Sequence, residues 1–354
     1  MRLVRQVVAI PRCIGYKIPE EKELCGVVMA NYLITGVAGF IAARVAELLL
    51  EEGHMVSGID NMNDAYDVRM KEHRLGRLRN RPGFTFYHAD ISDRQTFDPS
   101  TGLYQEHFDG VINLAARAGV RASVEDPWVY VDTNVTGTLN LLELCHRREI
   151  PKFILASTSS VYGAEAPLPT PETAESDRPL QSYAASKKGA EALSHAYHYL
   201  YGIDVTVVRY FTVYGPAGRP DMSMFRFVQW ISEGRPLKLF GDGKQSRGFT
   251  YVDDIARGTI MALKPVGYEI INLGGHEEIT ILELINIIER MIGKDAQIEQ
   301  YPAHRADMLA NWADVEKAGR LLNWEPQVSL EDGISRLVAW YNAERDWTSQ
   351  IETG

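Results

Sequence analysis

Apolar and polar residues alternate along the chain between short strand-like runs and longer amphipathic stretches. The run Asn31–Thr35 is typical of a buried strand and leads into a helical pattern through Leu50, which Gly53 ends. A second strand is expected from Met55 to Ile59. Later strands are expected at 83–88, 109–114, 151–157 and 203–209, and the longest helices at about 128–147 and 182–201. This alternation predicts an α/β fold, a doubly wound parallel sheet with right-handed crossovers.

The pattern changes after residue 210. Loop-forming Gly and Pro residues become frequent at 215–220 and 241–248, and only short elements intervene before a helix expected at 330–344. We therefore expect a sheet domain over 29–210. The remainder, 211–354, is expected to be mainly a smaller mixed α/β lobe that binds substrate, with some segments able to return to the sheet domain.

The first 28 residues form a separate extension of unknown role. Two prolines and the charged run Glu20–Glu23 interrupt the apolar stretch that a secretion signal needs. The extension is expected to be either an added arm or an upstream translation of a gene that starts at Met29, and both readings stay open.

Composition excludes several classes of protein. The 354 residues are 45% hydrophobic and 24% charged, which is ordinary for a globular chain and excludes disorder as the main state. The net charge is −10, with no basic run, so neither nucleic acid nor a membrane surface is an expected partner. No apolar run approaches a membrane span. The three cysteines have no zinc or disulfide spacing, so we expect no metal and a reduced, cytoplasmic location.

The turn after the first strand has the features of a phosphate-binding loop. Gly36 and Gly39 allow a tight turn in which the backbone and the following helix start can approach a pyrophosphate. Asp60 ends the next strand about 20 residues on, where a carboxylate can accept both ribose hydroxyls and repel a 2′-phosphate. The sequence therefore predicts a Rossmann-type domain that binds NAD rather than NADP.

A tyrosine and a lysine open the helix expected at 182–201. Their four-residue spacing puts Tyr183 and Lys187 on one helix face. Because a nearby ammonium and the positive nicotinamide both favour the phenolate, we expect Lys187 and the nicotinamide to lower the pKa of Tyr183 and make it a base for a sugar hydroxyl. The strand end Ser157–Ser160 supplies hydroxyl groups for the same site.

Together these segments resemble the extended short-chain dehydrogenases/reductases over residues 31 to about 345. The resemblance is carried by the Gly36–Ala42 loop, the strand end Asn113–Ala116, Asn134, Thr158 and the Tyr183/Lys187 pair. Within that family the chain is most similar to nucleotide-sugar 4-epimerases, and particularly to UDP-glucuronate 4-epimerases, through Gly58–Val68 and Phe211–Met222.

The resemblance implies roles residue by residue. Tyr183 is implied as the base, Lys187 as its partner, and Thr158 as a second hydroxyl on the reacting oxygen. The implied NAD contacts are Gly36, Gly39, Phe40, Ile41, Asp60, Asn61, Asp90, Ile91, Leu114, Ala115, Ala116, Asn134 and Lys187. The implied substrate contacts are Ser159, Ser160, Thr212, Arg219, Arg247, Arg305 and Asp307.

The implied reaction is a reversible C4 epimerisation of UDP-glucuronate through a transient 4-keto sugar. Related dehydratases and decarboxylases carry an acidic residue after Thr158, where this chain has Ser159 and Ser160. Thr212 and Arg219 are candidates to hold the sugar carboxylate. Three alternatives stay open: a 4-epimerase of neutral UDP-glucose and UDP-galactose, a UDP-glucuronate decarboxylase, and a non-catalytic NAD sensor.

The resemblance also implies a homodimer. In the family, helices equivalent to those at 128–147 and 182–201 pair into a four-helix interface. Their apolar faces are equally compatible with an ordinary core.

Overall fold

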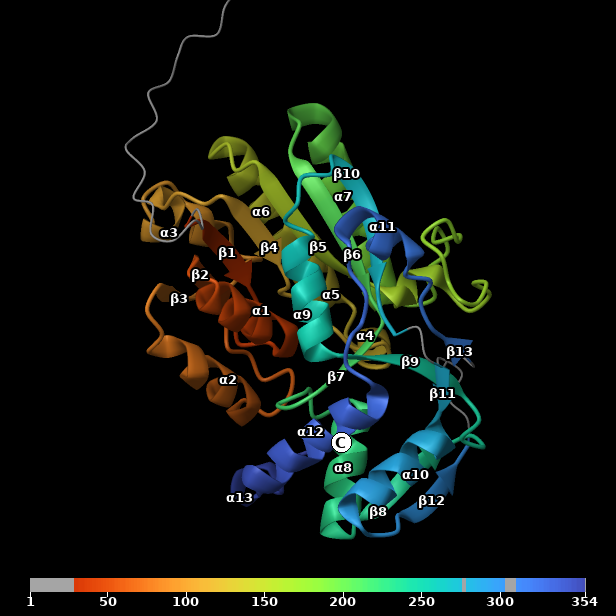
Figure 1. The fold of residues 1–354 in the computed structure, drawn as a ribbon. Coiled ribbons are helices and arrows are strands. Elements are labelled where there is room, and N and C mark those ends of the chain that lie inside the picture. The colour runs from red at the N-terminus through yellow and green to blue at the C-terminus, as the bar shows by residue number, and fades with distance from the viewer. Residues whose placement is uncertain (1–28, 276–277, 303–309, 354) are drawn as a thin grey trace, which may run out of the picture.

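In the computed structural model, described for residues 29–275, 278–302 and 310–353, the larger part of the chain is built on one parallel sheet (Figure 1). The seven strands lie in the order β10-β6-β5-β4-β1-β2-β3. They are β1 Asn31–Thr35, β2 Met55–Asp60, β3 Phe84–His88, β4 Gly110–Asn113, β5 Lys152–Thr158, β6 Asp204–Tyr210 and β10 Tyr268–Leu273. Each expected strand lies within one residue of its observed bounds, which confirms the doubly wound α/β prediction.

Helices cover both faces of this sheet. Alternate residues of each strand point to opposite faces, so Leu33 joins the core beneath α6 and α7 while Ile34 joins the core beneath α1, α2, α9 and α11. The helices are α1 Phe40–Glu51, α2 Arg69–Arg79, α3 Gly102–Gln105, α4 Ala122–Glu125, α5 Trp128–Val131, α6 Gly137–Arg147, α7 Ser182–Tyr201, α9 Val252–Met261 and α11 Glu316–Leu322. Two 3-10 turns span Arg94–Phe97 and Ser159–Tyr162.

One expected helix is interrupted, and one strand of the sheet comes from the segment in which some elements were expected to return to the sheet domain. The helix expected over 128–147 contains a π-turn at Asp132–Thr136, between α5 and α6. The seventh strand, β10, comes from the C-terminal half and pairs with β6. Residues 211–354 therefore contribute β10, α9 and α11 to the sheet domain as well as forming the second lobe.

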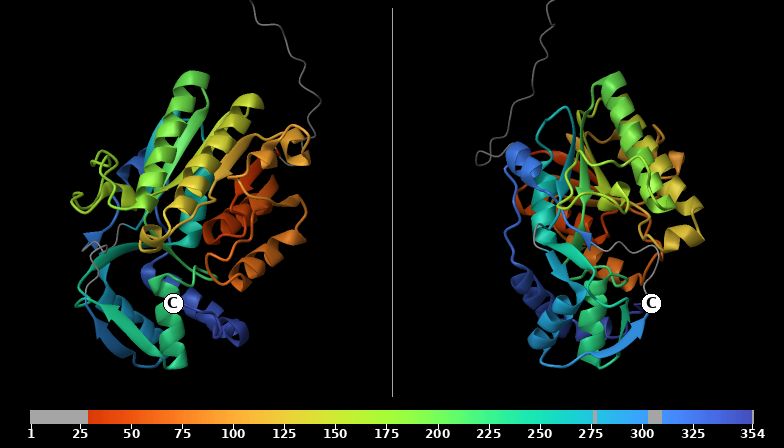
Figure 2. Two further views of the ribbon diagram at one scale, coloured as in Figure 1. Left: turned by 180° about the vertical axis from the view of Figure 1, so that it is seen from behind. Right: turned by 90° about the vertical axis from the view of Figure 1, so that its right-hand side faces the viewer.

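The second lobe packs around its own hydrophobic core against the edge where the parallel strands end (Figures 1 and 2). Its strands form a four-stranded sheet and a two-stranded sheet. They are β7 Thr212–Tyr214, β8 Pro236–Phe240, β9 Ser246–Tyr251, β11 Glu278–Thr280, β12 Gln297–Tyr301 and β13 Ala310–Asn311. Its helices are α8 Ser223–Glu233, α10 Ile281–Ile292, α12 Leu330–Ala343 and α13 Arg345–Thr348.

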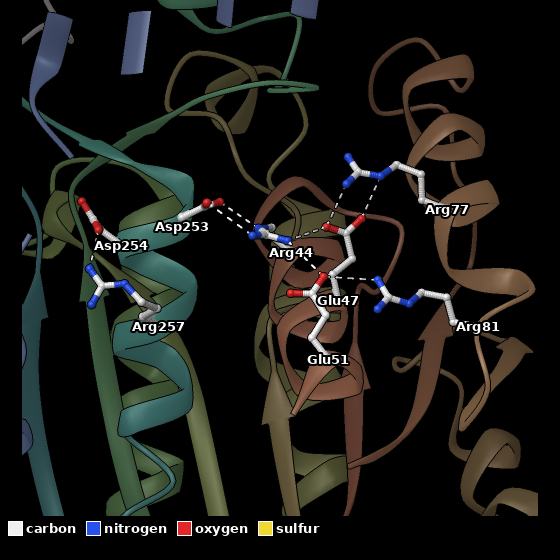
Figure 3. Close-up of polar contacts among 8 residues, drawn as sticks. All are labelled: Arg44, Glu47, Glu51, Arg77, Arg81, Asp253, Asp254 and Arg257. Atoms are coloured by element: carbon white, nitrogen blue, oxygen red, sulfur yellow. Dashed lines mark hydrogen bonds and ion pairs between the residues drawn. The ribbon is translucent and has the colours of Figure 1, made fainter. Parts of the chain in front are cut away.

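A series of ion pairs joins α1 to the helices on either side of it (Figure 3). Arg44 on α1 pairs with Asp253 on α9 (Nε to Oδ1, 2.7 Å) and with Glu47 (3.0 Å). Glu47 in turn pairs with Arg77 on α2 (2.9 Å). Glu47 is buried, whereas the Arg44 and Arg77 side chains are 24% and 51% exposed, so solvent screens these pairs in part and they help to align the three helices.

No helix among residues 29–275, 278–302 and 310–353 is long and apolar enough to cross a membrane.

Candidate active site

The turn between β1 and α1 has the geometry of a phosphate cradle. Gly36 has φ of 69°, and a Cβ atom there would lie 2.8 Å from the Cα atom of Ala115. Gly39 is the N-cap of α1 and offers no side chain to its open N–H groups. The first turn of α1, with Phe40 and Ile41, therefore presents unpaired donors and the positive end of the helix dipole at the sheet edge.

Asp60, the last residue of β2, is held beside this turn. Its carboxylate accepts hydrogen bonds from the backbone N–H of Ala38 (3.1 Å) and of Met62 (2.8 Å). The ammonium of Lys71 lies 3.7 Å away. The structure thus brings together Gly36, Gly39 and Asp60, the residues expected to hold the phosphates and a ribose.

The other expected cofactor residues line the same edge. Asp90 follows β3 and accepts a hydrogen bond from the Asn61 side chain (2.7 Å), next to Ile91. Burial raises the pKa of Asp90, but hydrogen bonds from Ser92 and Asn61 outweigh it and keep that pKa below its ordinary value. The segment Leu114–Ala116 continues β4, where the Ala115 N–H donates to Thr35 Oγ1 (3.1 Å).

Tyr183 and Lys187 lie at the start of α7, against the end of β5. A hydrogen bond joins Tyr183 to Thr158, the last residue of β5. Lys187 is 2% exposed, and its Nζ atom donates to the backbone oxygen of Ala156 (2.9 Å). The three proposed catalytic side chains are therefore side by side.

The lowering of the Tyr183 pKa expected from Lys187 and the nicotinamide stays a prediction, but in the protein alone burial acts in the opposite direction. Burial raises the pKa of Tyr183, opposed by the hydrogen bond with Thr158 and the positive charge of Arg219. Burial also lowers the pKa of Lys187 to about 8, opposed by the charge of Glu191. The sequence pattern gave the spacing of the pair but not its desolvation, which disfavours the charged form of both groups.

Asn134 lies in the π-turn, buried behind the same site. Its amide accepts from the Arg117 N–H (2.9 Å) and donates to the Arg117 oxygen (3.0 Å) and to Ser186 Oγ (2.9 Å). The Ser186 hydroxyl in turn donates to the backbone oxygen of Tyr183 (2.8 Å). Asn134 thus joins the loop after β4 to the first turn of α7, as π-turns at functional sites often do.

The second lobe supplies Arg219 to this site. Arg219 follows β7 and forms a two-point ion pair with Asp221 (Nε to Oδ1, 3.0 Å; Nη2 to Oδ2, 2.5 Å). Burial lowers the pKa of Arg219, but Asp221 outweighs it and keeps that pKa above its ordinary value. The charge of Arg219 also opposes the rise in the pKa of Tyr183 that burial causes. Thr212 begins β7 in the same connection.

The first of the two serines after Thr158 contacts the second lobe, and the second contacts Thr158 itself. Ser159 Oγ accepts a hydrogen bond from Asn311 on β13 (3.0 Å), and Ser160 N–H donates to Thr158 Oγ1 (3.2 Å). Arg247 on β9 lies opposite Asn311 in the β-ladder, so it faces the same region of the lobe. The predicted residues Arg305 and Asp307 lie outside the described residues.

Sequence reasoning missed three residues of this site. Asn311 has no motif around it, and only the pairing of β13 with β9 brings it to Ser159. Tyr130 packs edge-on against Tyr183, with ring centroids 6.1 Å apart. Asp221 belongs to the segment that carried the family resemblance, but its two-residue spacing from Arg219 was not read as an ion pair.

A buried ion pair supports the helix that carries Tyr183. Glu191, one turn beyond Lys187, binds Arg209 of β6 through two hydrogen bonds (2.9 and 2.7 Å). Ser157 Oγ also donates to Glu191 (2.6 Å). The phenol of Tyr183, the hydroxyl of Thr158 and the ammonium of Lys187 thus come together at the end of β5, an arrangement that can take a proton from an alcohol and return it.

Comparison with known proteins agrees with this site. The model of the NAD-dependent epimerase/dehydratase family matches residues 32–274. A UDP-glucuronate 4-epimerase of Thermodesulfobacterium geofontis is 58% identical over 313 residues, which make up 88% of this chain and 96% of that protein.

Solved structures share the fold as well. A UDP-glucuronic acid 4-epimerase from Bacillus cereus, in complex with UDP-glucuronic acid and NAD, has a TM-score of 0.82 and 37% identity; the match covers 89% of this chain and 99% of that chain. The UDP-glucose 4-epimerase of Thermotoga maritima, with UDP-glucose, also has a TM-score of 0.82, at 32% identity and the same coverage. The region matched by the family model contains the Gly36 turn, Tyr183 and Lys187.

Proposed function

The chain belongs to the NAD-dependent epimerase/dehydratase family, and from that premise we infer that it interconverts UDP-glucuronate and UDP-galacturonate by epimerisation at C4, using bound NAD. The observation that carries this function is the placement of Tyr183 and the buried Lys187 against the end of β5, beside Thr158, with Arg219 supplied by the second lobe. A base and a carboxylate-binding group are both needed when the sugar is a uronic acid.

The residues of the sheet edge fit NAD. Gly36 lets the turn pack against the Ala115 backbone, where a Cβ atom would have no room, the first turn of α1 offers donors for the pyrophosphate, and Asp60 offers a carboxylate for the adenine ribose. We propose that Asn61, Asp90, Ile91 and Leu114–Ala116 complete the cofactor site, with Asn134 acting through the loop it holds. When bound, NAD accepts a hydride from C4 and later returns it to the other face of the sugar.

Tyr183 and Thr158 manage the proton of the same reaction. We propose that the Tyr183 phenolate removes the proton of the C4 hydroxyl while Thr158 hydrogen-bonds to the reacting oxygen. Lys187 lies one helical turn behind and binds the nicotinamide ribose. Because burial raises the pKa of Tyr183, the positive charges around it are needed for it to act as a base near neutral pH.

Arg219 and the serines hold the sugar carboxylate. Oxidation at C4 makes the substrate a β-keto acid, which loses CO2 unless its carboxylate is restrained. The planar guanidinium of Arg219 can grip a carboxylate through two parallel hydrogen bonds, as it already grips Asp221. We propose that Thr212, Ser159 and Ser160 share this contact. Arg247, Arg305 and Asp307 are proposed to bind the nucleotide, the last two on the family resemblance alone.

One incubation tests this function. The purified protein is given UDP-glucuronate without added NAD, and products are identified by NMR and chromatography. UDP-galacturonate without release of CO2 is the expected result and implies that NAD is retained. UDP-pentose as the main product would replace the proposal by a decarboxylase. If the sample stays inert with added NAD but converts UDP-glucose, the enzyme is a neutral-sugar epimerase and Arg219 has a structural role.

We also propose that the enzyme is a homodimer through the face of α6 and α7, which lie side by side behind the sheet (Figure 2). Trp128 and Val131 on α5 are 77% and 45% exposed, and Tyr199 at the end of α7 is 80% exposed. Apolar side chains gathered on one face favour a protein partner. Light scattering is expected to give twice the chain mass, and the Trp128→Asp variant the monomer mass. Tyr301→Asp, on β12, is the control and is expected to stay dimeric.

A further inference from the structure

One buried arginine outside the predicted site joins the two halves of the active centre. Arg74 lies on α2 and is 3% exposed. Its Nε and Nη2 atoms donate to the backbone oxygens of Ala217 (2.8 Å) and Gly218 (3.1 Å). Its Nη1 atom donates to the Ala38 oxygen (3.2 Å) and to the Tyr66 hydroxyl (2.8 Å). One side chain thus holds the cofactor turn and the connection that carries Arg219.

The connection that Arg74 holds has an unfavourable backbone. Ala217 has φ of 53°, a left-handed conformation that costs a residue with a Cβ atom on the order of 1 kcal/mol. Such a residue keeps its conformation only where its surroundings fix it. The charge-assisted bonds from Arg74 to Ala217 and Gly218 supply that constraint, two residues and one residue before Arg219.

Aromatic rings complete the link. The Arg74 guanidinium lies 5.5 Å from the centre of the Tyr66 ring and 5.9 Å from that of Phe40, the first residue of α1. Arg219 lies 6.0 Å from the centre of the same Tyr66 ring. Among the described residues no carboxylate pairs with Arg74, so its charge is balanced by carbonyl dipoles and ring faces. Tyr66 therefore lies between the two arginines, and its position is fixed by Arg74.

We propose that Arg74 is a positioning residue that fixes Arg219 relative to the cofactor turn and thereby determines whether the oxidised sugar keeps its carboxylate. This inference rests on the proposed function. In the reaction to be prevented, the C5–C6 bond breaks and CO2 leaves. The electron pair of the broken C5–C6 bond forms a C4–C5 enolate with its negative charge on the C4 oxygen, and a proton then adds at C5. The return of the hydride to C4 then gives a UDP-pentose, so NAD is regenerated and the overall products are UDP-pentose and CO2.

Lysine cannot replace Arg74 in this role. Four of the five N–H donors of the guanidinium are directed at four oxygen atoms from three separate segments. An ammonium keeps the charge but reaches only part of this set, so Arg74→Lys should loosen the Arg219 connection while the fold survives. A misplacement of about 1 Å can change a rate on the order of a hundredfold.

The test compares product ratios. Arg74→Lys and Arg74→Met are incubated with UDP-glucuronate beside the wild type and Arg77→Met, and UDP-galacturonate, UDP-pentose and CO2 are measured. Arg77 is the matched control, because it lies half-exposed on the same helix, and its ion pair is with Glu47 of α1 and not with the connection that carries Arg219 (Figure 3). We expect the ratio of UDP-pentose to UDP-galacturonate to rise about ten- to a hundredfold in both Arg74 variants. It should stay at the wild-type value in Arg77→Met.

The outcomes separate the two proposals. Lower turnover with an unchanged product ratio would show that Arg74 only supports the fold. If neither Arg74 variant folds by circular dichroism, Tyr66→Phe decides, since it removes one of the four acceptors and should raise the ratio by a smaller factor; an unchanged ratio refutes the inference. A wild type that leaves UDP-glucuronate unchanged refutes the proposed function, and the role of Arg74 with it.

Discussion

The strongest test of the electrostatics behind Tyr183 is the substitution Glu191→Gln. Glu191 and Arg209 are 2% and 1% exposed and are joined by two hydrogen bonds of 2.9 and 2.7 Å. The same carboxylate provides the charge that opposes the desolvation of Lys187. The change to an amide keeps the shape of the side chain and removes both effects.

The cost to stability follows from the burial of the pair. Removing one partner of a buried ion pair costs about 3–5 kcal/mol, since the other charge is left uncompensated. Arg209 has little to replace the contact, because its Nη1 atom already lacks a hydrogen-bond partner among the described residues. A domain whose stability is about 5–15 kcal/mol survives this loss, so the variant should fold and unfold at lower denaturant concentration.

The substitution Glu191→Gln should also change how stability and activity depend on pH. Burial lowers the pKa of Lys187 from 10.5 to about 8, so the folded chain holds this proton less tightly than the unfolded chain does. Lys187 therefore destabilises the fold below about pH 8, and stability recovers as the pH rises from about 8 toward 10.5. Without Glu191 the pKa of Lys187 falls further. The alkaline limit of activity, where Lys187 loses its proton, should then move to lower pH.

The assay is urea unfolding together with a pH–rate profile, beside Glu331→Gln as the control. Glu331 lies on α12, and it and its partner Arg290 are 61% and 68% exposed, so its loss should cost within about 1 kcal/mol and leave the profile unchanged. A loss of stability in Glu191→Gln with an unshifted alkaline limb would refute the link to Lys187. A variant as stable as the wild type would refute the energetic argument for the buried pair.

Three further predictions follow from the site. Gly36→Ala should lose retained NAD, measured as nucleotide released on denaturation, because its Cβ atom has no room. Gly53→Ala, whose Cβ atom would have nothing within 4 Å, should keep NAD, and equal NAD content in both variants would contradict the phosphate cradle. Tyr183→Phe should lower turnover about 10²–10⁴-fold at unchanged NAD content, and near-normal turnover would remove Tyr183 as the base. Asp221→Asn should move the acid limb of the pH–rate profile to lower pH, because the positive charge of Arg219 is then no longer balanced by Asp221 and lowers the pKa of Tyr183 further. An unmoved acid limb would disprove that coupling.

The parts of the fold that could be predicted are those with local signals. Helix α7 has the expected bounds, Ser182–Tyr201, because its apolar period is regular and Gly202 stops it in a left-handed conformation. The sheet strands are short apolar runs between turns. The π-turn at Asp132–Thr136 has no such signal, since one extra residue in a helical turn leaves the apolar pattern almost unchanged.

The residues of the site that the sequence did not predict are brought there by contacts between distant segments of the chain. Helix α2 carries four arginines in eleven residues, and this charge pattern predicts a solvent-exposed helix. They are Arg69, Arg74, Arg77 and Arg79. Only the approach of the Gly215–Arg219 connection from the second lobe buries Arg74 and leaves Arg77 outside. Asn311 reaches Ser159 by the same kind of contact across the chain.

Arg219 links the two requirements of the proposed reaction. Its charge lowers the pKa of Tyr183 and so favours the base, and the same guanidinium is the proposed holder of the substrate carboxylate. A bound carboxylate partly cancels that charge, as Asp221 does, and so makes the phenolate less favourable. An epimerase of a uronic acid must therefore draw additional positive charge from elsewhere around Tyr183. Lys187, one helical turn from Tyr183, is the expected source, and because the charge of Glu191 raises the pKa of Lys187, we expect the buried Glu191–Arg209 pair to affect the chemistry as well as the fold.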